Sequence, residues 1–172
     1  MCFDLVQGTP RGKIKIFTAG GSIDKTYDLH ASDFLIGPSQ VGDVLREANV
    51  TIPFEVEEFV RKDSLQMTDE DREQLRQLVA GEPAERIVIT HGTDTLHLTG
   101  QALSEIPGKV IVLTAAMRPA SFKDTDAHFN IGCAFIAAQT LPEGVYLVIN
   151  GRVFDPFRAN KNTQSRCFDD AP

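Results

Sequence analysis

Four short apolar runs stand out along the chain. They cover residues 13–18 (KIKIFT), 86–90 (RIVIT), 109–114 (KVIVLT) and 144–150 (GVYLVIN). Short β-branched runs of this kind are typical of strands in a sheet that is covered on both faces. A fifth run, FEVEEFV at 54–60, is more amphipathic. We therefore expect a sheet of four to five strands.

Segments with a helical period separate these runs. They span residues 39–49, 68–80, 94–106 and 124–139. At the start of the second segment, Thr68 and Asp71 have a variant of the capping-box spacing that begins many helices. Alternation of strand and helix predicts an α/β fold, with three α/β/α layers and a mainly parallel sheet.

The length of 172 residues fits one domain that buries its own core without disulfides or metals. We expect a loose N-terminal extension over residues 1–12, a single domain over 13–166 and a weakly ordered tail over 167–172. The composition, 42% hydrophobic and 24% charged, is that of an ordinary globular protein.

Charge and cysteine content narrow the class of protein. The formal net charge of −7 argues against nucleic acid or an anionic membrane as a partner, because both require clustered basic residues. No stretch has the length of a membrane span. The three widely spaced cysteines and four scattered histidines form no metal-ligand pattern, so we expect no metal site and a reducing, cytoplasmic setting.

Polar residues and glycines follow three of the predicted strands, at residues 18–22, 91–95 and 115–118. Right-handed crossovers place the carboxyl ends of parallel strands at one edge, where open α/β sheets bind ligands. The three segments therefore predict a ligand site. The alternative is ordinary loop and helix-cap chemistry, for which threonine and aspartate are also well suited.

The glycine pair Gly20-Gly21 does not have the spacing of a dinucleotide fingerprint or a P-loop. The segment THGTDT at 90–95 is more specific, because its glycine permits close backbone approach and its Thr93 and Asp94 offer a hydroxyl beside a carboxylate. Lys161 is the candidate base. A lone lysine in a polar segment is, however, most often a solvated charge.

Four segments together resemble the threonine-dependent L-asparaginase family of bacterial type. They are TAGGSI (18–23), VITHGTDTL (88–96), VLTAAMRP (112–119) and NGRVFDPFRANKN (150–162). Their order, spacing and strand-end placement match over about residues 13–161. Full-length members carry a second, C-terminal domain, so the chain is similar to the short, single-domain members.

The resemblance implies hydrolysis of L-asparagine, or of L-glutamine, without a metal or organic cofactor. It implies a catalytic relay of Thr93, Asp94 and Lys161, with Asp94 also holding the substrate α-amino group. The substrate contacts that it implies are Gly20, Ser22, Ser64, Gln66, Gly92 and Ala116, of which Ser64 receives the α-carboxylate. It also implies a homo-oligomer, because the pockets of the family form between subunits.

Two departures from the family pattern concern the nucleophile. Ala19 occupies the position of the attacking threonine, and the neighbouring Thr18 is expected to point to the opposite face of its strand unless a bulge re-aims it. Phe34 stands where the family often has a tyrosine. Tyr27 is the candidate replacement, on a loop that we expect to be a mobile lid.

These departures leave three explanations. The chain is an amidohydrolase that uses Thr18 or the Thr93 relay. Alternatively, it is a non-catalytic amino-acid or amide-binding module, a pseudoenzyme that kept the pocket. In the third explanation, the alanine is an engineered substitution that silences the enzyme. Hydrolysis is the leading hypothesis.

Overall fold

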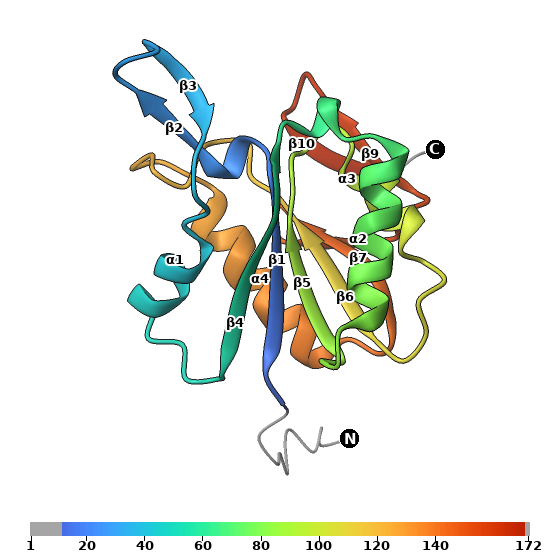
Figure 1. The fold of residues 1–172 in the computed structure, drawn as a ribbon. Coiled ribbons are helices and arrows are strands. Elements are labelled where there is room, and N and C mark those ends of the chain that lie inside the picture. The colour runs from blue at the N-terminus through green and yellow to red at the C-terminus, as the bar shows by residue number, and fades with distance from the viewer. Residues whose placement is uncertain (1–11, 171–172) are drawn as a thin grey trace.

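The computed structural model describes residues 12–170, and its centre is a six-stranded sheet (Figure 1). The strand order is β4 (Phe54–Lys62), β1 (Ile14–Gly20), β5 (Arg86–Thr90), β6 (Val110–Thr114), β7 (Gly144–Ile149) and β8 (Arg152–Phe154). All neighbouring pairs are parallel except β7 and β8. All five predicted strands are present, and the amphipathic one, β4, lies at an edge of the sheet, where its residues are half-buried or exposed.

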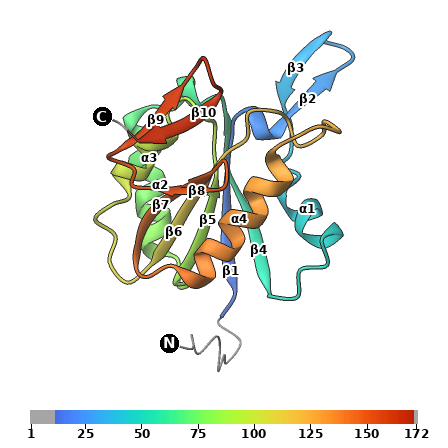
Figure 2. The ribbon, with the colours of Figure 1, turned by 180° about the vertical axis from the view of Figure 1, so that it is seen from behind.

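Helices cover both faces of the sheet, which confirms the predicted three-layer architecture. Helices α2 (Asp69–Gly81) and α3 (Leu96–Ala102) lie in front in Figure 1, and α1 (Val41–Glu47) and α4 (Ala127–Thr140) lie in front in Figure 2. Each face has its own apolar core. The predicted capping box of α2 forms, with Asp71 N donating to Thr68 Oγ1 at 3.2 Å and Thr68 N donating to Asp71 Oδ2 at 2.9 Å.

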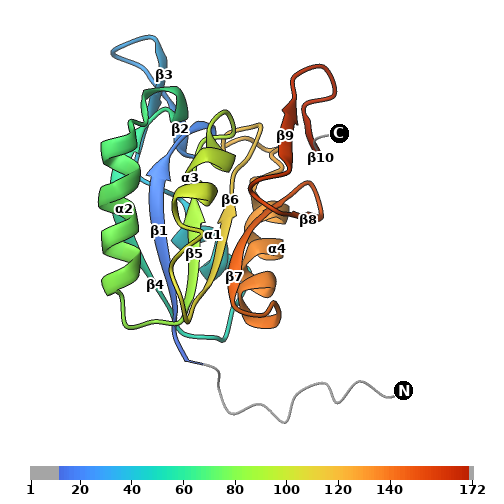
Figure 3. The same cartoon turned by 90° about the vertical axis from the view of Figure 1, so that its right-hand side faces the viewer.

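Two antiparallel hairpins rise from the carboxyl edge of the sheet, on opposite sides of it (Figure 3). One consists of β2 (Lys25–Asp28) and β3 (Asp33–Ile36), and the other of β9 (Ala159–Asn162) and β10 (Cys167–Asp170). Two short 3-10 helices, η1 (Ser22–Asp24) and η2 (Ser64–Gln66), follow the ends of β1 and β4. The hairpins and the turns between them surround the edge where the ligand site is expected.

The expectation of a weakly ordered tail over 167–172 is wrong for residues 167–170, which form β10. Phe168 is 1% exposed and its ring packs against that of Phe154 with centroids 6.3 Å apart. Its N–H donates to Asn150 Oδ1 at 3.0 Å. Burial of this one aromatic ring and the pairing with β9 hold the segment in place.

The proposed N-terminal extension over residues 1–12 lies almost wholly outside the described residues, as do residues 171–172. Within the part of the chain that the structure describes, no helix is both long and apolar enough to span a bilayer.

Candidate active site

Three of the predicted site residues meet where β5 ends. Thr93 and Asp94 belong to the loop between β5 and α3, and β9 brings Lys161 over that loop. Lys161 Nζ donates to Thr93 Oγ1 at 2.7 Å and to Asp94 Oδ1 at 2.7 Å. The Lys161 and Asp94 side chains are 20% and 39% exposed, whereas Thr93 is 3% exposed. The structure thus joins a hydroxyl, a carboxylate and an amine at the ligand-binding edge.

Ser64, the first residue of η2, ties this loop to the end of β4. Its Oγ accepts from Asp94 N at 3.2 Å and donates to Asp94 Oδ2 at 3.5 Å. Its carbonyl accepts from Thr95 Oγ1 at 2.7 Å. Ser64 is 1% exposed, so the serine orients the Asp94 carboxylate in the structure, and its part in receiving a substrate carboxylate stays a prediction.

The glycines of the site are required by backbone packing. Gly21 has a φ of +85°, and a Cβ there would lie 2.3 Å from Gly92 Cα. A Cβ on Gly92 would lie 2.6 Å from Ser64 Cβ. Three segments that are distant in sequence therefore pack backbone against backbone. Gly20 has a φ of +81° and a Cβ there would lie 2.7 Å from the Lys62 carbonyl oxygen, so the turn can be made only by glycine.

Ala19 and Thr18 point to opposite layers. Ala19 follows Phe17 on the face covered by α2 and α3, and it is 1% exposed. Thr18 pairs in register with Thr90 and continues the face of Ile16, which α4 covers. The pairing of β1 with β4 does shift after Thr18, but the extra residues are on β4. This irregularity therefore leaves the alternation of β1 intact.

The remaining predicted site residues lie around the edge in different settings. Ser22 is half-buried in η1, Gln66 is exposed in η2, and Ala116 is fully buried after β6. Tyr27 lies on β2 and packs edge-on against Phe34, with ring centroids 5.4 Å apart. Because that hairpin rises on the other side of the edge from β9, Tyr27 is not brought together with Lys161 (Figure 1).

The His91 side chain supports the loop between β5 and α3 from within the core. The side chain is fully buried, and burial lowers its pKa from 6.5 to about 4, so the ring is neutral at pH 7. Nδ1 lies 2.9 Å from the Gly92 carbonyl oxygen, which only accepts, so Nδ1 carries the proton. Nε2 then accepts from Thr99 Oγ1 at 2.9 Å. The ring thereby connects the glycine of the loop to α3.

A hydrogen-bond network at the start of α4 holds the neighbouring loop after β6. The Asp126 carboxylate accepts from the backbone N–H groups of residues 117 and 118, at 2.9 and 3.0 Å. Asn130 Nδ2 donates to the Ala115 carbonyl at 2.9 Å, and its Oδ1 accepts from Asn150 N at 3.1 Å. Asn130 was not among the site residues predicted from the sequence. The four-residue spacing from Asp126, which places both on one side of a helix, was the available signal.

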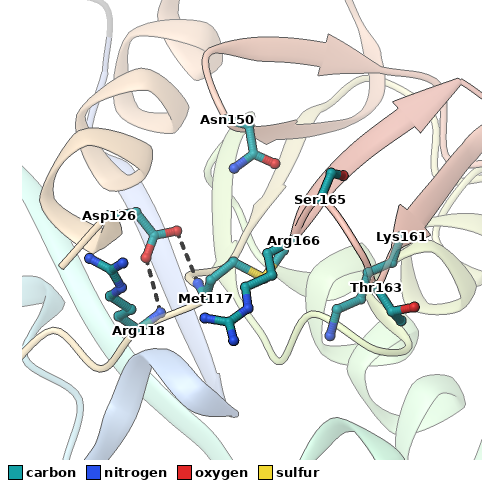
Figure 4. Close-up of a pocket in the computed structure, with 8 residues that line it drawn as sticks. All are labelled: Met117, Arg118, Asp126, Asn150, Lys161, Thr163, Ser165 and Arg166. Carbon is teal, nitrogen blue, oxygen red and sulfur yellow. Dashed lines mark hydrogen bonds between the residues drawn. The ribbon is translucent and has the colours of Figure 1, made fainter.

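A pocket of about 560 Å³ lies beside Lys161, on the side away from Thr93 and Asp94 (Figure 4). It separates the loop after β6 from the β9–β10 hairpin, and its lining includes Met117, Arg118, Lys161, Thr163, Ser165 and Arg166. The family resemblance implied a pocket lined by backbone near Gly92, Thr93 and Ala116. None of these three residues lines this cavity, which reaches the relay only through Lys161.

Within residues 12–170, no three His, Cys, Asp or Glu side chains come together in a way that could hold a metal ion.

Comparisons with known proteins extend the resemblance. The family model "Asparaginase, N-terminal" matches residues 13–170. The L-asparaginase of Thermococcus kodakarensis is 32% identical over 138 residues, which cover 77% of this chain and 40% of that protein. One subunit of the glutamyl-tRNA(Gln) amidotransferase of Methanococcus vannielii is 46% identical over 77 residues, covering 42% of this chain and 17% of that protein.

Solved structures agree with the sequence comparisons. The Thermococcus kodakarensis L-asparaginase has a TM-score of 0.79 at 26% identity, and the match covers 92% of this chain and 51% of that chain. The "Probable Cytoplasmic L-asparaginase" of Campylobacter jejuni has a TM-score of 0.71 at 27% identity, with the same two coverages. The chain spans about half the length of these relatives or less. Because the family model matches nearly all of the described residues, the chain belongs to the asparaginase family, in the part that forms the N-terminal domain.

Proposed function

We propose that the chain hydrolyses the side-chain amide of L-asparagine to L-aspartate and ammonia. The observation that carries this proposal is the position of Lys161 Nζ, 2.7 Å from both Thr93 Oγ1 and Asp94 Oδ1. A hydroxyl, a base and an acid that orients the base are the parts that nucleophilic acyl transfer requires. The L-asparaginases among the relatives support the substrate class, with L-glutamine as the competing amide.

In the proposed reaction, Thr93 supplies the attacking oxygen because Ala19 has none. Lys161 takes the Thr93 proton while Oγ1 attacks the amide carbon. The carbon–nitrogen bond then breaks, and the same proton passes to the departing ammonia. Water hydrolyses the resulting threonine ester, which releases L-aspartate and restores the hydroxyl.

Asp94 orients the base in this sequence of steps. It fixes the Lys161 amine by the 2.7 Å contact and is itself oriented by Ser64. Its exposed fraction of 39% leaves the carboxylate open to a cationic α-amino group of the substrate, which is the contact that the family resemblance implies. Ser64 would then exchange one of its present hydrogen bonds for the substrate α-carboxylate.

The setting and partners of the chain are part of the same proposal. We expect a cytoplasmic protein that needs no cofactor and acts as a homo-oligomer. An apolar hollow of about 610 Å³ between α4 and β8, with Phe129, Ile136 and Val153 exposed around it, supports self-association. Some relatives are named as subunits of an amidotransferase, so a different protein is the alternative to a second copy of the chain as a partner.

A second candidate function is an amide-binding module without turnover. Two observations favour it. Ala19 removes the hydroxyl at the family's attacking position, and Thr93, the remaining candidate, is only 3% exposed. In such a module Asp94 and Lys161 would still bind the charged groups of an amino acid, and no step would consume it.

Replacement of Lys161 by methionine tests the hydrolase proposal. Removal of the base should lower kcat for ammonia release from L-asparagine by at least about 10²-fold. Lys123→Met, which removes an exposed lysine outside the relay, is the matched control and should keep full activity. Circular dichroism melting of both variants separates loss of catalysis from loss of folding. An unchanged kcat in a folded Lys161→Met protein would refute the relay.

A further inference from the structure

The pocket beside Lys161 carries one cation that no other side chain neutralises. Arg118 Nη1 pairs with Asp124 at 2.7 Å, and Lys161 pairs with Asp94 at 2.7 Å. Among residues 12–170, the Arg166 guanidinium has neither a hydrogen-bond nor an ion-pair partner. Figure 4 shows it directed into the hollow between Met117 and Lys161.

The other polar groups of the pocket leave donors available and few acceptors. Asp126 is the acidic side chain of the lining, but its two oxygens already accept from the N–H groups of residues 117 and 118 and from Asn130. Thr163 and Ser165 add two exposed hydroxyls from the β9–β10 turn. A cavity with a free guanidinium and spare hydroxyl donors suits an anionic group, most directly a planar carboxylate.

The backbone at Arg166 gives an independent reason to assign it a role. Its φ is +54°, in the left-handed region that non-glycine residues rarely occupy. Asn162 Oδ1 fixes the preceding turn by accepting from the N–H groups of residues 164 and 165. Hairpin turns usually place glycine or asparagine in such a conformation. An arginine is therefore disfavoured by the backbone here, and residues held in this way cluster at functional sites.

We propose that this pocket binds a carboxylate on the amine side of the scissile amide, and that Arg166 selects for it. The inference rests on the proposed hydrolysis. Lys161 contacts Thr93 on one side and lines the pocket on the other, so a substituent on the amide nitrogen would extend past Lys161 toward Arg166. A volume of about 560 Å³ lies within the range of pockets that enclose ligands larger than one small amino acid.

The substrate class is then an asparagine whose side-chain nitrogen carries a carboxylate-bearing group, as in a β-aspartyl peptide. The reaction balances as simple hydrolysis. Water adds across the carbon–nitrogen bond, the acyl carbon leaves as the aspartate side-chain carboxylate, and the nitrogen leaves as an amine that has gained a proton. Arg166 would hold the carboxylate of that departing amine.

The test compares β-aspartylglycine with β-aspartylglycinamide, which differ only in the terminal carboxylate. A charge-assisted pair with Arg166 should make kcat/KM of the unmodified chain about tenfold higher for the carboxylate. Arg166→Asn keeps a residue that tolerates the left-handed backbone, so its Tm should not fall, and the ratio of the two kcat/KM values should drop to about one. Arg46→Asn, on the outer surface of α1, should keep the tenfold ratio.

Each outcome decides a separate point. Equal kcat/KM values in the unmodified chain, or an unchanged ratio in Arg166→Asn, would overturn the subsite, and so would cleavage of L-asparagine alone. If no amide is cleaved, the hydrolase proposal fails and the equilibrium Kd values of the two dipeptides decide about the pocket. Tighter binding of the carboxylate by about tenfold, lost in Arg166→Asn, would support the subsite, and equal Kd values would overturn it.

Discussion

The carboxyl edge of the sheet has two regions that differ in what their residues contribute. In the relay region, formed by the loop 91–95 and β9, three polar side chains meet within hydrogen-bond distance. In the glycine-turn region, formed by residues 18–22 and the β2–β3 hairpin, the backbone of the turn packs closely against neighbouring segments. Residue 19 in this turn is an alanine that is 1% exposed.

The family pattern requires both a tightly packed glycine turn and a catalytic relay, and this difference separates the two requirements. The glycine turn is needed to let β1 approach Gly92, and that packing does not depend on a hydroxyl at residue 19. The relay needs only the loop after β5 and the β9 hairpin. Loss of a nucleophile in one region can therefore leave the geometry of the other region intact, and variants of each region can test it separately.

The largest effect is expected in the relay region, at Thr93. Thr93→Val keeps the shape of the side chain and removes the oxygen that we propose attacks the amide. Ammonia release from L-asparagine should fall by at least about 10³-fold, because loss of a nucleophile removes nearly all catalysis by a cooperative set. Thr51→Val, at an exposed loop position, is the control. If Thr93→Val retained activity, another group would have to be the nucleophile.

The next effect tests the packing of the glycine-turn region. Gly21→Ala places a methyl group 2.3 Å from Gly92 Cα at a backbone φ of +85°, so both the clash and the strain act on main-chain atoms. The free energy of unfolding should fall by roughly 3 kcal/mol. Gly132→Ala, in the middle of α4 with no atom within 4 Å of the new methyl group, should instead gain up to about 1 kcal/mol. Urea unfolding of both variants measures the contrast, and equal stabilities would contradict the packing argument.

The smallest effect is a pH dependence with opposite signs in the two regions. Asp24, in η1 of the glycine-turn region, is 3% exposed, and burial raises its pKa to about 6. Between pH 4 and 6 the folded chain keeps a proton that the unfolded chain has lost, so stability decreases as pH rises through this window. His91, with its pKa lowered to about 4, acts in the opposite direction, and its contribution is lost as pH falls from 6.5 toward 4.

Asp24→Asn isolates the first of these contributions. The variant should be more stable than the unmodified chain at pH 7, by at most about 3 kcal/mol, and the difference should shrink toward pH 4. Asp43→Asn, at an exposed position of α1, is the matched control for the same change of residue outside the core. A constant difference for Asp24→Asn would mean that the carboxyl group is not desolvated in the folded chain.

Features that rest on a repeating sequence pattern, or on residues close together in the chain, could be predicted from the sequence. The β-branched runs predicted five strands of the sheet, and the spacing of Thr68 and Asp71 predicted the start of α2. Thr93 and Asp94 were placed correctly beside Lys161 through the family motifs. Helix α3 is shorter than the predicted 94–106, because the site loop uses the residues up to 95 and residues 103–105 form a turn before Pro107.

Features that depend on contacts between distant segments were not predictable. Strand β10 is held by the packing of Phe168 on Phe154 and by its pairing with β9, and its local sequence pattern predicts neither contact. The pocket beyond Lys161 depends on where the β9–β10 turn places Arg166, which follows from a left-handed backbone that no motif marks. The position of Tyr27 depends on the direction in which the β2–β3 hairpin leaves the sheet.

Ammonia release from L-asparagine by the unmodified chain, measured beside its Ala19→Thr variant, tests the central claim most directly. If Thr93 is the nucleophile of a working relay, the unmodified chain turns over, and a hydroxyl at residue 19 is not required. Turnover by the Ala19→Thr variant alone would contradict this account. In that case the relay region would be a binding site that lacks its nucleophile, and the alanine would be the reason.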